Sequence, residues 1–224
     1  MRGFKVSRDP RFVEKLEDVV GLYMSPPVHA LVLCCDEKSQ VQALDRTQPG
    51  LPMKKGRAAT MTHDYKRNGT TTLFAALNVL DGQVIGQCQQ CHTHVERLKF
   101  LRQIDRETPK DKTLHLIADN YATHKHPAAQ VWLAKLPRFN MHFTPTSASS
   151  LNMVERLFRD ISENRLRRGV FTSVPELVAA VDGYIAHHNI NPKPFIWTKS
   201  VRDILQKVIR ANSNLTAKEN ATLH

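Results

Sequence analysis

The chain has 224 residues, with 32 Lys and Arg against 21 Asp and Glu, which gives a formal net charge of +11. A domain of this size can fold without disulfides, and a hydrophobic content of 41% excludes a wholly disordered chain. No apolar run approaches the ~18 residues of a membrane span, and the N-terminus has no apolar signal-peptide core. We therefore expect a cytoplasmic protein with an anionic partner such as nucleic acid.

Hydrophobic periodicity and turn signals divide the chain into alternating elements. Asp81-Gly82 is a hairpin turn signal, and Ser173-Val-Pro-Glu176 can cap a helix. The elements predicted in chain order are a helix over 9–23, strands over 30–35, 71–80 and 83–88, a helix over 95–104, a strand over 114–118, a helix over 128–136, a strand over 139–143, and helices over 151–167, 173–188 and 200–210.

The order of these elements indicates an α/β protein with a mixed sheet, because strands come first and helices alternate later. Residues 45–70 form a long polar connection, and connections of this length are usually functional or mobile. We expect three parts: an N-terminal helix and linker over 1–29, one folded domain over 30–211, and a disordered tail over 212–224.

Three carboxylates occur where the predicted elements can bring them together. Asp36 and Asp119 each follow a predicted buried strand, and Glu155 lies near the start of the helix over 151–167. Strand ends place side chains in the crevice where open α/β sheets bind ligands. Converging carboxylates favour a hard divalent cation such as Mg²⁺ or Mn²⁺, and two such ions can hold the attacking and leaving oxygens of a phosphodiester.

Each acid also has an ordinary structural interpretation. Asp36 and Asp119 could form the turns that follow their strands. Asn152 could cap the helix while Glu155 bonds back to it, and Arg159 one turn later could pair with Glu155. Spacing alone leaves both interpretations open.

A set of motifs in a fixed order makes the sequence recognisable. The motifs are CDEKSQ at 35–40, ALDRTQPG at 43–50, THDYKRNG at 62–69, DNYATH at 119–124, FTPTSA at 143–148 and LNMVE at 151–155. Together they resemble the bacterial insertion-sequence transposases related to mariner, and the resemblance runs from about Ser7 to Lys207. These relatives normally carry an N-terminal helix-turn-helix region, which precedes the part that this chain resembles.

The resemblance implies a ribonuclease-H-like fold, α/β with a mixed central sheet flanked by helices. It implies a DDE catalytic triad of Asp36, Asp119 and Glu155 that binds Mg²⁺ or Mn²⁺, with two ions expected. Glu163 is the alternative third acid, but it lacks the Leu-Asn-x-x-Glu context. The implied reaction is cleavage of DNA at transposon ends, then attack of the freed 3′-hydroxyl on target DNA, typically at TA. A homodimer on DNA at the nucleoid is the expected complex.

Further residues are expected to support this site. Asn120 is placed to orient a metal-bound water or a carboxylate, and a turn role is its alternative. His124 could lie near the scissile phosphate or begin a helix, and Asn152 is expected to support the carboxylates. Two basic groups are expected to contact the DNA backbone, although a solvated basic face is the alternative. The first group is Lys54, Lys55, Arg57, Lys66 and Arg67, and the second is Arg156, Arg159, Arg165, Arg167 and Arg168.

The motif formed by Cys88, Cys91, His92 and His94 has the pattern of c-type haem attachment, and the four residues could also bind zinc. Haem attachment requires export, and structural zinc sites usually use two separated ligand pairs. A strand end that runs into a helix start is the favoured interpretation.

Two other functions compete with transposition. A nuclease of the same fold would hydrolyse DNA without joining it to a target. A truncated or inactive copy would bind DNA, or dimerise with a full-length transposase, as a regulator. Products of strand transfer distinguish the first competitor, and a helix-turn-helix region encoded upstream of this reading frame would distinguish the second.

Overall fold

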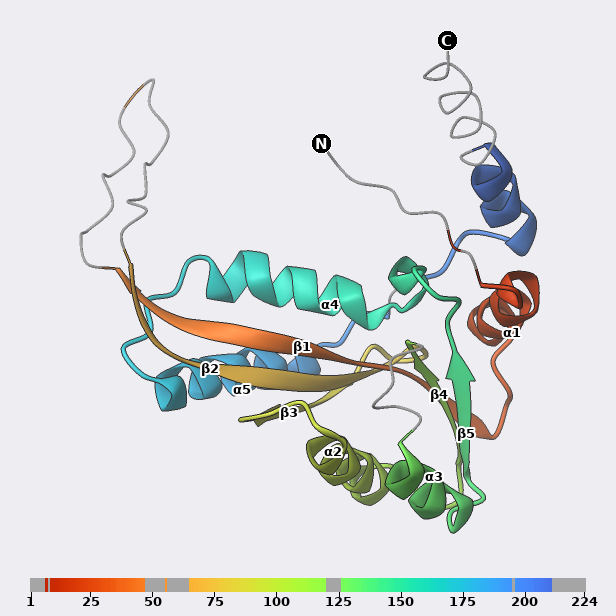
Figure 1. The fold of residues 1–224 in the computed structure, drawn as a ribbon, viewed down its shortest axis with the longest axis horizontal. Coiled ribbons are helices and arrows are strands. Elements are labelled where there is room, and N and C mark those ends of the chain that lie inside the picture. Colours follow the sequence, from red (N-terminus) through yellow and green to blue (C-terminus); the bar gives the residue numbers. More distant parts are fainter. Residues whose placement is uncertain are drawn as a thin grey trace.

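The computed structural model describes residues 7, 9–46, 55, 65–119, 126–194 and 196–210. Five strands form one sheet in the order β3-β2-β1-β4-β5 (Figure 1). β1 pairs antiparallel with β2, and β2 with β3, whereas β4 pairs parallel with β1 and with β5. The predicted mixed sheet is therefore confirmed. The strand bounds are Ala30–Arg46, Tyr65–Asn78, Val84–Gln89, Thr113–Ala118 and Phe139–Phe143 for β1 to β5.

Helices cover both faces of this sheet. The helices are α1 (Phe12–Met24), α2 (His94–Glu107), α3 (Pro127–Ala134), α4 (Val154–Ile161) and α5 (Val174–Ile190), together with the short η2 (Ser149–Leu151), the π-helical η3 (Ser162–Leu166) and a further helix over 201–210. In Figure 1, α2 and α3 lie together on one side of the sheet and α4 lies on the other. Among the described helices, none is long and apolar enough to cross a bilayer.

Alternation along β1 separates two hydrophobic cores. Val32 and Cys34 point into the core under α4 and α5, whereas Leu33 and Cys35 point into the core under α2 and α3. Since side chains alternate along a strand, the next residue on the α4 face is Asp36. The buried alternation of an apolar strand thus aims this carboxylate at α4.

A third, smaller core joins distant parts of the chain. Leu16 and Val20 of α1 pack with Leu151 of η2, and Trp197 and Val201 pack against them. This small core connects α1 and the C-terminal helix to the segment that leads into α4. The domain boundary predicted at residue 29 lies between α1 and β1, and both of these elements pack in hydrophobic cores of the molecule.

β1 is longer than the sequence predicted. It continues to Arg46, so Asp36 lies within the strand and not at its end, and β2 begins at Tyr65 and not at residue 71. The pairing of β1 with β2 is irregular between Lys38 and Val41, where Gln40 has a φ of 52°. This bulge lets the strand continue through a polar run beyond the predicted strand end at residue 35.

The predicted single helix over 151–167 is also wrong in detail. η2 ends at Leu151, α4 starts only at Val154, and the last turn is the π-helical η3. The remaining predicted strands and helices lie close to the structural ones. The strand end at β3 and the helix start at His94 confirm the favoured interpretation of the Cys-His motif, and all four cysteines are free.

Candidate active site

Asp36 is a buried carboxylate in the middle of β1, with only 8% of its surface exposed. One of its oxygens accepts a hydrogen bond from the Glu37 amide at 2.8 Å, and the other lies 3.5 Å from Nδ2 of Asn152. The same Nδ2 donates to the carbonyl oxygen of Cys35 at 3.0 Å. Asn152 therefore connects the segment before α4 to the backbone and the carboxylate of β1.

Burial raises the pKa of Asp36 to about 7. The negative charges of Asp119, Glu37 and Glu155 contribute to this rise after burial, and the hydrogen bond from the Glu37 amide opposes it. A buried carboxyl among three other acids is costly to ionise without a compensating cation. A neighbouring cation would therefore stabilise the ionised form of Asp36.

Asp119 follows β4 directly and lies next to β1. The parallel register pairs Cys34 with Ile117, so two residues further on the chain brings Asp119 alongside Asp36. Neighbouring strands lie about 4.8 Å apart, which puts the two carboxylates on one face within reach of each other. Asp119 also lines a hollow of about 260 Å³ whose other residues belong to the loop over 144–149.

Glu155 is exposed on the first turn of α4. Partial burial raises its pKa, the charge of Asp119 adds to this rise, and the ammonium of Lys38 opposes it. The structure therefore places all three predicted acids on the α4 side of the sheet, close enough for their charges to interact. In the described part of the chain, no three acidic, His or Cys side chains already surround a single point as metal ligands do.

Two of the ordinary interpretations of these residues are wrong. Asn152 is not the helix cap, because Met153 occupies the N-cap position and makes no capping side-chain bond. Arg159 places its Nε 3.7 Å from Oδ1 of Asp160, and this is the ion pair it forms. Asn152 is instead directed at Asp36, which is the supporting position that the sequence suggested.

Sequence reasoning missed Arg97. This residue lies on the inner face of α2 with 3% of its surface exposed, and its Nη2 is buried with no hydrogen-bond partner within the described residues. Burial lowers the pKa of the Arg97 guanidinium, whereas Cys35, Glu37, Asp36 and Asp119 raise it. A cation is thus buried behind the carboxylates. Helical spacing from Phe100 and Ile104 would have placed it there.

Several predicted residues lie outside the described part of the chain, namely Asn120, His124, Lys54 and Arg57. The members of the two predicted DNA-binding groups that the structure describes are all exposed, namely Lys55, Lys66, Arg67, Arg156, Arg159, Arg165, Arg167 and Arg168. The two groups come close at the far end of α4. There, the Phe171 amide donates to the Leu44 carbonyl at 2.9 Å, and Asn68 Nδ2 donates to the Phe171 carbonyl at 3.2 Å.

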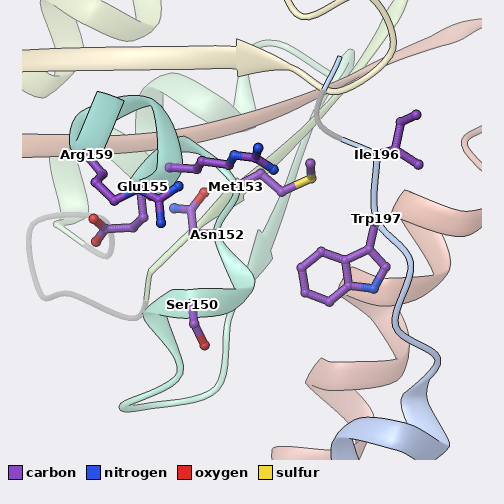
Figure 2. Close-up of a pocket in the computed structure, with 8 residues that line it drawn as sticks. Ser150, Asn152, Met153, Glu155, Arg159, Ile196 and Trp197 are labelled. Carbon is purple, nitrogen blue, oxygen red and sulfur yellow. The ribbon is translucent and has the colours of Figure 1, made fainter. Parts of the chain in front are cut away.

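A pocket of about 370 Å³ opens beside Glu155. Figure 2 shows Glu155 and Arg159 on one side of it and Trp197 and Ile196 facing them from the C-terminal segment. The complete lining is Ser150, Asn152, Met153, Glu155, Arg156, Arg159, Ile196 and Trp197. The candidate site thus combines acids, arginines and apolar side chains.

A buried aspartate, a second one at the end of a parallel neighbour strand and a helix glutamate on a mixed sheet define a class of nucleic-acid-cleaving enzymes. The family model described as DDE superfamily endonuclease matches residues 31–178, and the chain belongs to that family. A protein of Shigella sonnei, the insertion element IS630 uncharacterized 39 kDa protein, is 28% identical over 97 residues. The match covers 43% of this chain and 28% of that protein.

The fold is similar to that of the Mos1 mariner transposase. The Mos1 strand transfer complex superposes with a TM-score of 0.61 at 15% identity, over 94% of this chain and 62% of the Mos1 chain. The paired end complex with Mn gives 0.60 at 16%, over 83% and 59%. The isolated Mos1 catalytic domain gives 0.56 at 12%, over 94% and 92%. These similarities confirm the predicted ribonuclease-H-like fold.

The chain spans less than a third of the insertion-element protein and about three-fifths of the Mos1 chains in the DNA complexes. It spans nearly all of the isolated Mos1 catalytic domain. In Mos1, the similar region is therefore the part that the isolated catalytic domain contains.

Proposed function

We propose that the chain is the catalytic core of a DDE transposase that cleaves DNA at transposon ends and joins the freed strand to target DNA. The observation that carries the proposal is the shared electrostatic environment of Asp36, Asp119 and Glu155 on the α4 side of the sheet. Their arrangement supports assignment of these three residues as the catalytic triad. Membership of the endonuclease family supports the same chemistry.

The triad fits a divalent cation by the chemistry of its donors. All three side chains offer carboxylate oxygens, which suit Mg²⁺ and Mn²⁺. Burial and neighbouring negative charge raise the pKa of Asp36 to about 7, so a bound divalent cation would stabilise its ionised form. When bound, two such ions would activate a hydroxyl nucleophile and stabilise the leaving oxygen of the phosphodiester. The Mos1 paired end complex with Mn supports this choice of metal.

The protein's own residues supply position. Asp36 is fixed by the Glu37 amide and held near Asn152, while Asn152 is anchored on the Cys35 carbonyl. Glu155 extends from the first turn of α4, where the helix N-terminus favours negative charge. In the reaction, a water oxygen forms a bond to phosphorus and the P–O3′ bond breaks, which leaves a 3′-hydroxyl. That hydroxyl then forms a bond to a target phosphorus, and the target P–O3′ bond breaks and leaves a target 3′-hydroxyl.

DNA is the proposed partner. The exposed basic residues of α4 and η3 continue from Glu155 towards the basic start of β2, so a strand held at the triad can follow them. A homodimer on paired transposon ends, TA target sites and action at the nucleoid complete the proposal. The similarity to Mos1 complexes that contain transposon ends supports the DNA-bound assembly.

A matched pair of variants tests this proposal. Glu155→Gln keeps the size of the side chain but removes its charge, and Glu163→Gln makes the same change at an exposed acid on η3. With supercoiled plasmid and Mn²⁺, we expect Glu155→Gln to reduce strand cleavage at least about 100-fold and Glu163→Gln to leave it unchanged. Equal activity of both variants would remove Glu155 from the triad.

Pre-cut DNA ends with a free 3′-hydroxyl distinguish a transposase from a nuclease. We expect joined products when these ends are incubated with plasmid and Mn²⁺. Cleavage without joined products would instead identify an enzyme that only hydrolyses. A chain that binds DNA but neither cleaves nor joins it would be a regulator.

A further inference from the structure

The pocket beside Glu155 has a composition that the triad does not explain. Metal ligands need oxygen donors, yet this pocket also has an aromatic ring, two aliphatic side chains and two arginines. Its volume of about 370 Å³ is near the lower end of the ~300–1,000 Å³ that is typical of small-molecule sites. It therefore suits one small planar group and not a folded partner.

Trp197 forms a fixed wall of this pocket. Its indole Nε1 donates to the Lys199 carbonyl at 2.6 Å, so its polar atom is already bonded. Its ring centroid lies 5.1 Å from that of Tyr23, whose hydroxyl donates to the Leu151 carbonyl at 2.7 Å. The Trp197 ring is thus held in place before any ligand arrives, which lowers the entropic cost of stacking on it.

Ile196 extends the apolar wall, although 80% of its surface is exposed. Arg159 lies opposite Trp197, on the same side of the pocket as Glu155 (Figure 2). Arg156, one turn before Arg159 on α4, also lines the pocket. An apolar, aromatic wall in a pocket lined by two arginines is complementary to a nucleotide, because the base stacks on the ring and the phosphate pairs with arginine.

We propose that this pocket binds an unstacked nucleobase of the nucleotide that adjoins the scissile phosphodiester. This proposal rests on the proposed function, since Glu155 is both a triad residue and part of the lining. Inside a duplex both faces of a base are covered by its neighbours, so the occupant has to come from an unpaired end or from a base turned out of the helix. The pocket then helps to place the phosphate at the triad.

Fluorescence of Trp197 tests the proposal directly. The chain has two tryptophans, Trp132 and Trp197. Trp132 is part of α3 and packs against the core between the sheet and the helices α2 and α3. In a Trp132→Phe background, the indole signal therefore reports on the pocket. The probes are a short duplex with unpaired thymidines at one 3′ end, the same duplex with blunt ends, and the same overhang built from abasic sugars. All are titrated without divalent metal, and anisotropy of labelled DNA reports total binding.

We expect the unpaired thymidines to quench Trp197 and to tighten binding about tenfold over the blunt duplex, and the abasic overhang to lose both effects. Two exposed isoleucines give a matched control. Ile196→Ser should remove most of the gain, whereas Ile190→Ser, with 79% of its surface exposed outside the pocket, should keep it.

Each alternative result has a clear meaning. If abasic and thymidine overhangs bind equally, the base pocket is overturned while DNA binding and the proposed function stand. If no form of DNA binds even at low salt, the proposed function fails and the pocket proposal falls with it. If Trp197 fluorescence changes with protein concentration alone, a second copy covers the pocket, and this also overturns the proposal.

Discussion

The two faces of the sheet bury charges of opposite sign, a carboxylate on the α4 face and a guanidinium on the α2 face. On the α4 face, several acids converge around Asp36, and an asparagine side chain and a backbone amide support it. On the α2 face, Arg97 is buried on the same helix as Phe100 and Ile104, and its Nη2 has no hydrogen-bond partner within the described residues. The α4 face carries a hydrophobic core and the acidic site, whereas the α2 face carries a hydrophobic core and a buried positive charge. The experiments below test that division.

The largest effect on stability should come from the hydrophobic core under α2 and α3. Phe100 is fully buried on α2, and its ring centroid lies 5.7 Å from that of Phe74. We expect Phe100→Ala to lower the free energy of unfolding by about 3–5 kcal/mol, because it leaves a cavity. Urea titration followed by circular dichroism measures this loss. The exposed Val131 gives the control, since Val131→Ala should change stability by less than about 0.5 kcal/mol.

The carboxylate face should show its cost as a pH dependence. Because the folded pKa of Asp36 is about 7 and its ordinary value is 3.8, the folded state keeps a proton that the unfolded chain has lost. Stability of the metal-free protein should therefore fall as pH rises from about 4 to 7 and then level off, by on the order of 2–4 kcal/mol.

Asp36→Asn should abolish that pH slope and make the metal-free protein more stable at pH 8, while cleavage is lost. Denaturant titrations across the pH range, in the presence of EDTA, compare the two proteins. A slope that persists in Asp36→Asn would assign it to another group, and the electrostatic description of this face would be wrong.

Asn152 connects the two halves of the site. Asn152→Ala removes the hydrogen bond to the Cys35 carbonyl, and we expect a loss of about 1–2 kcal/mol in unfolding free energy. If Asn152 also positions Asp36, cleavage should fall by more than the lost stability explains, at a temperature where the variant is fully folded. Unchanged cleavage by the folded variant would reduce Asn152 to a purely structural residue.

Arg97 should give the smallest change in stability and the most specific one. Arg97→Met keeps much of the side-chain volume and removes a buried cation, so we expect unfolding free energy at pH 5 to change by about 1 kcal/mol or less. The pKa of Asp36 should rise, because its nearby positive charge is gone, and the pH-dependent fall in stability should move to higher pH. An unchanged midpoint would show that Arg97 does not act on the carboxylates.

The sequence predicted most of this architecture, because short apolar strands, the Asp-Gly turn of the hairpin and the capping residues of a helix are strong local signals. The continuation of β1 was missed, since the run from Glu37 to Gln40 is polar and its strand pairing depends on a bulge with the partner strand. Propensity acts locally, whereas this pairing is tertiary.

The sequence proposed the three acids and Asn152, whose catalytic and supporting roles stay predictions, and it missed Arg97. The three acids were found from strand ends and motif order, but Asp36 turned out to lie inside its strand. Asn152 had two local roles available, and only the position of β1 decides between them. Arg97 occupies a position on α2 where helical spacing usually predicts a hydrophobic residue. Its proposed role therefore follows from its interaction with Asp36 and Asp119, which the sequence of α2 does not contain.

The small core around Leu151 has a consequence for mutational scanning. Leu16 and Val20 do not line the pocket beside Glu155, yet they pack on Leu151, which leads into α4 and Glu155. Substitutions at these α1 positions should therefore appear in a screen for lost activity at a frequency typical of catalytic neighbours. A map of sensitive positions drawn along the sequence would show an isolated peak near residue 20, and the fold explains that peak as part of the same mechanical unit.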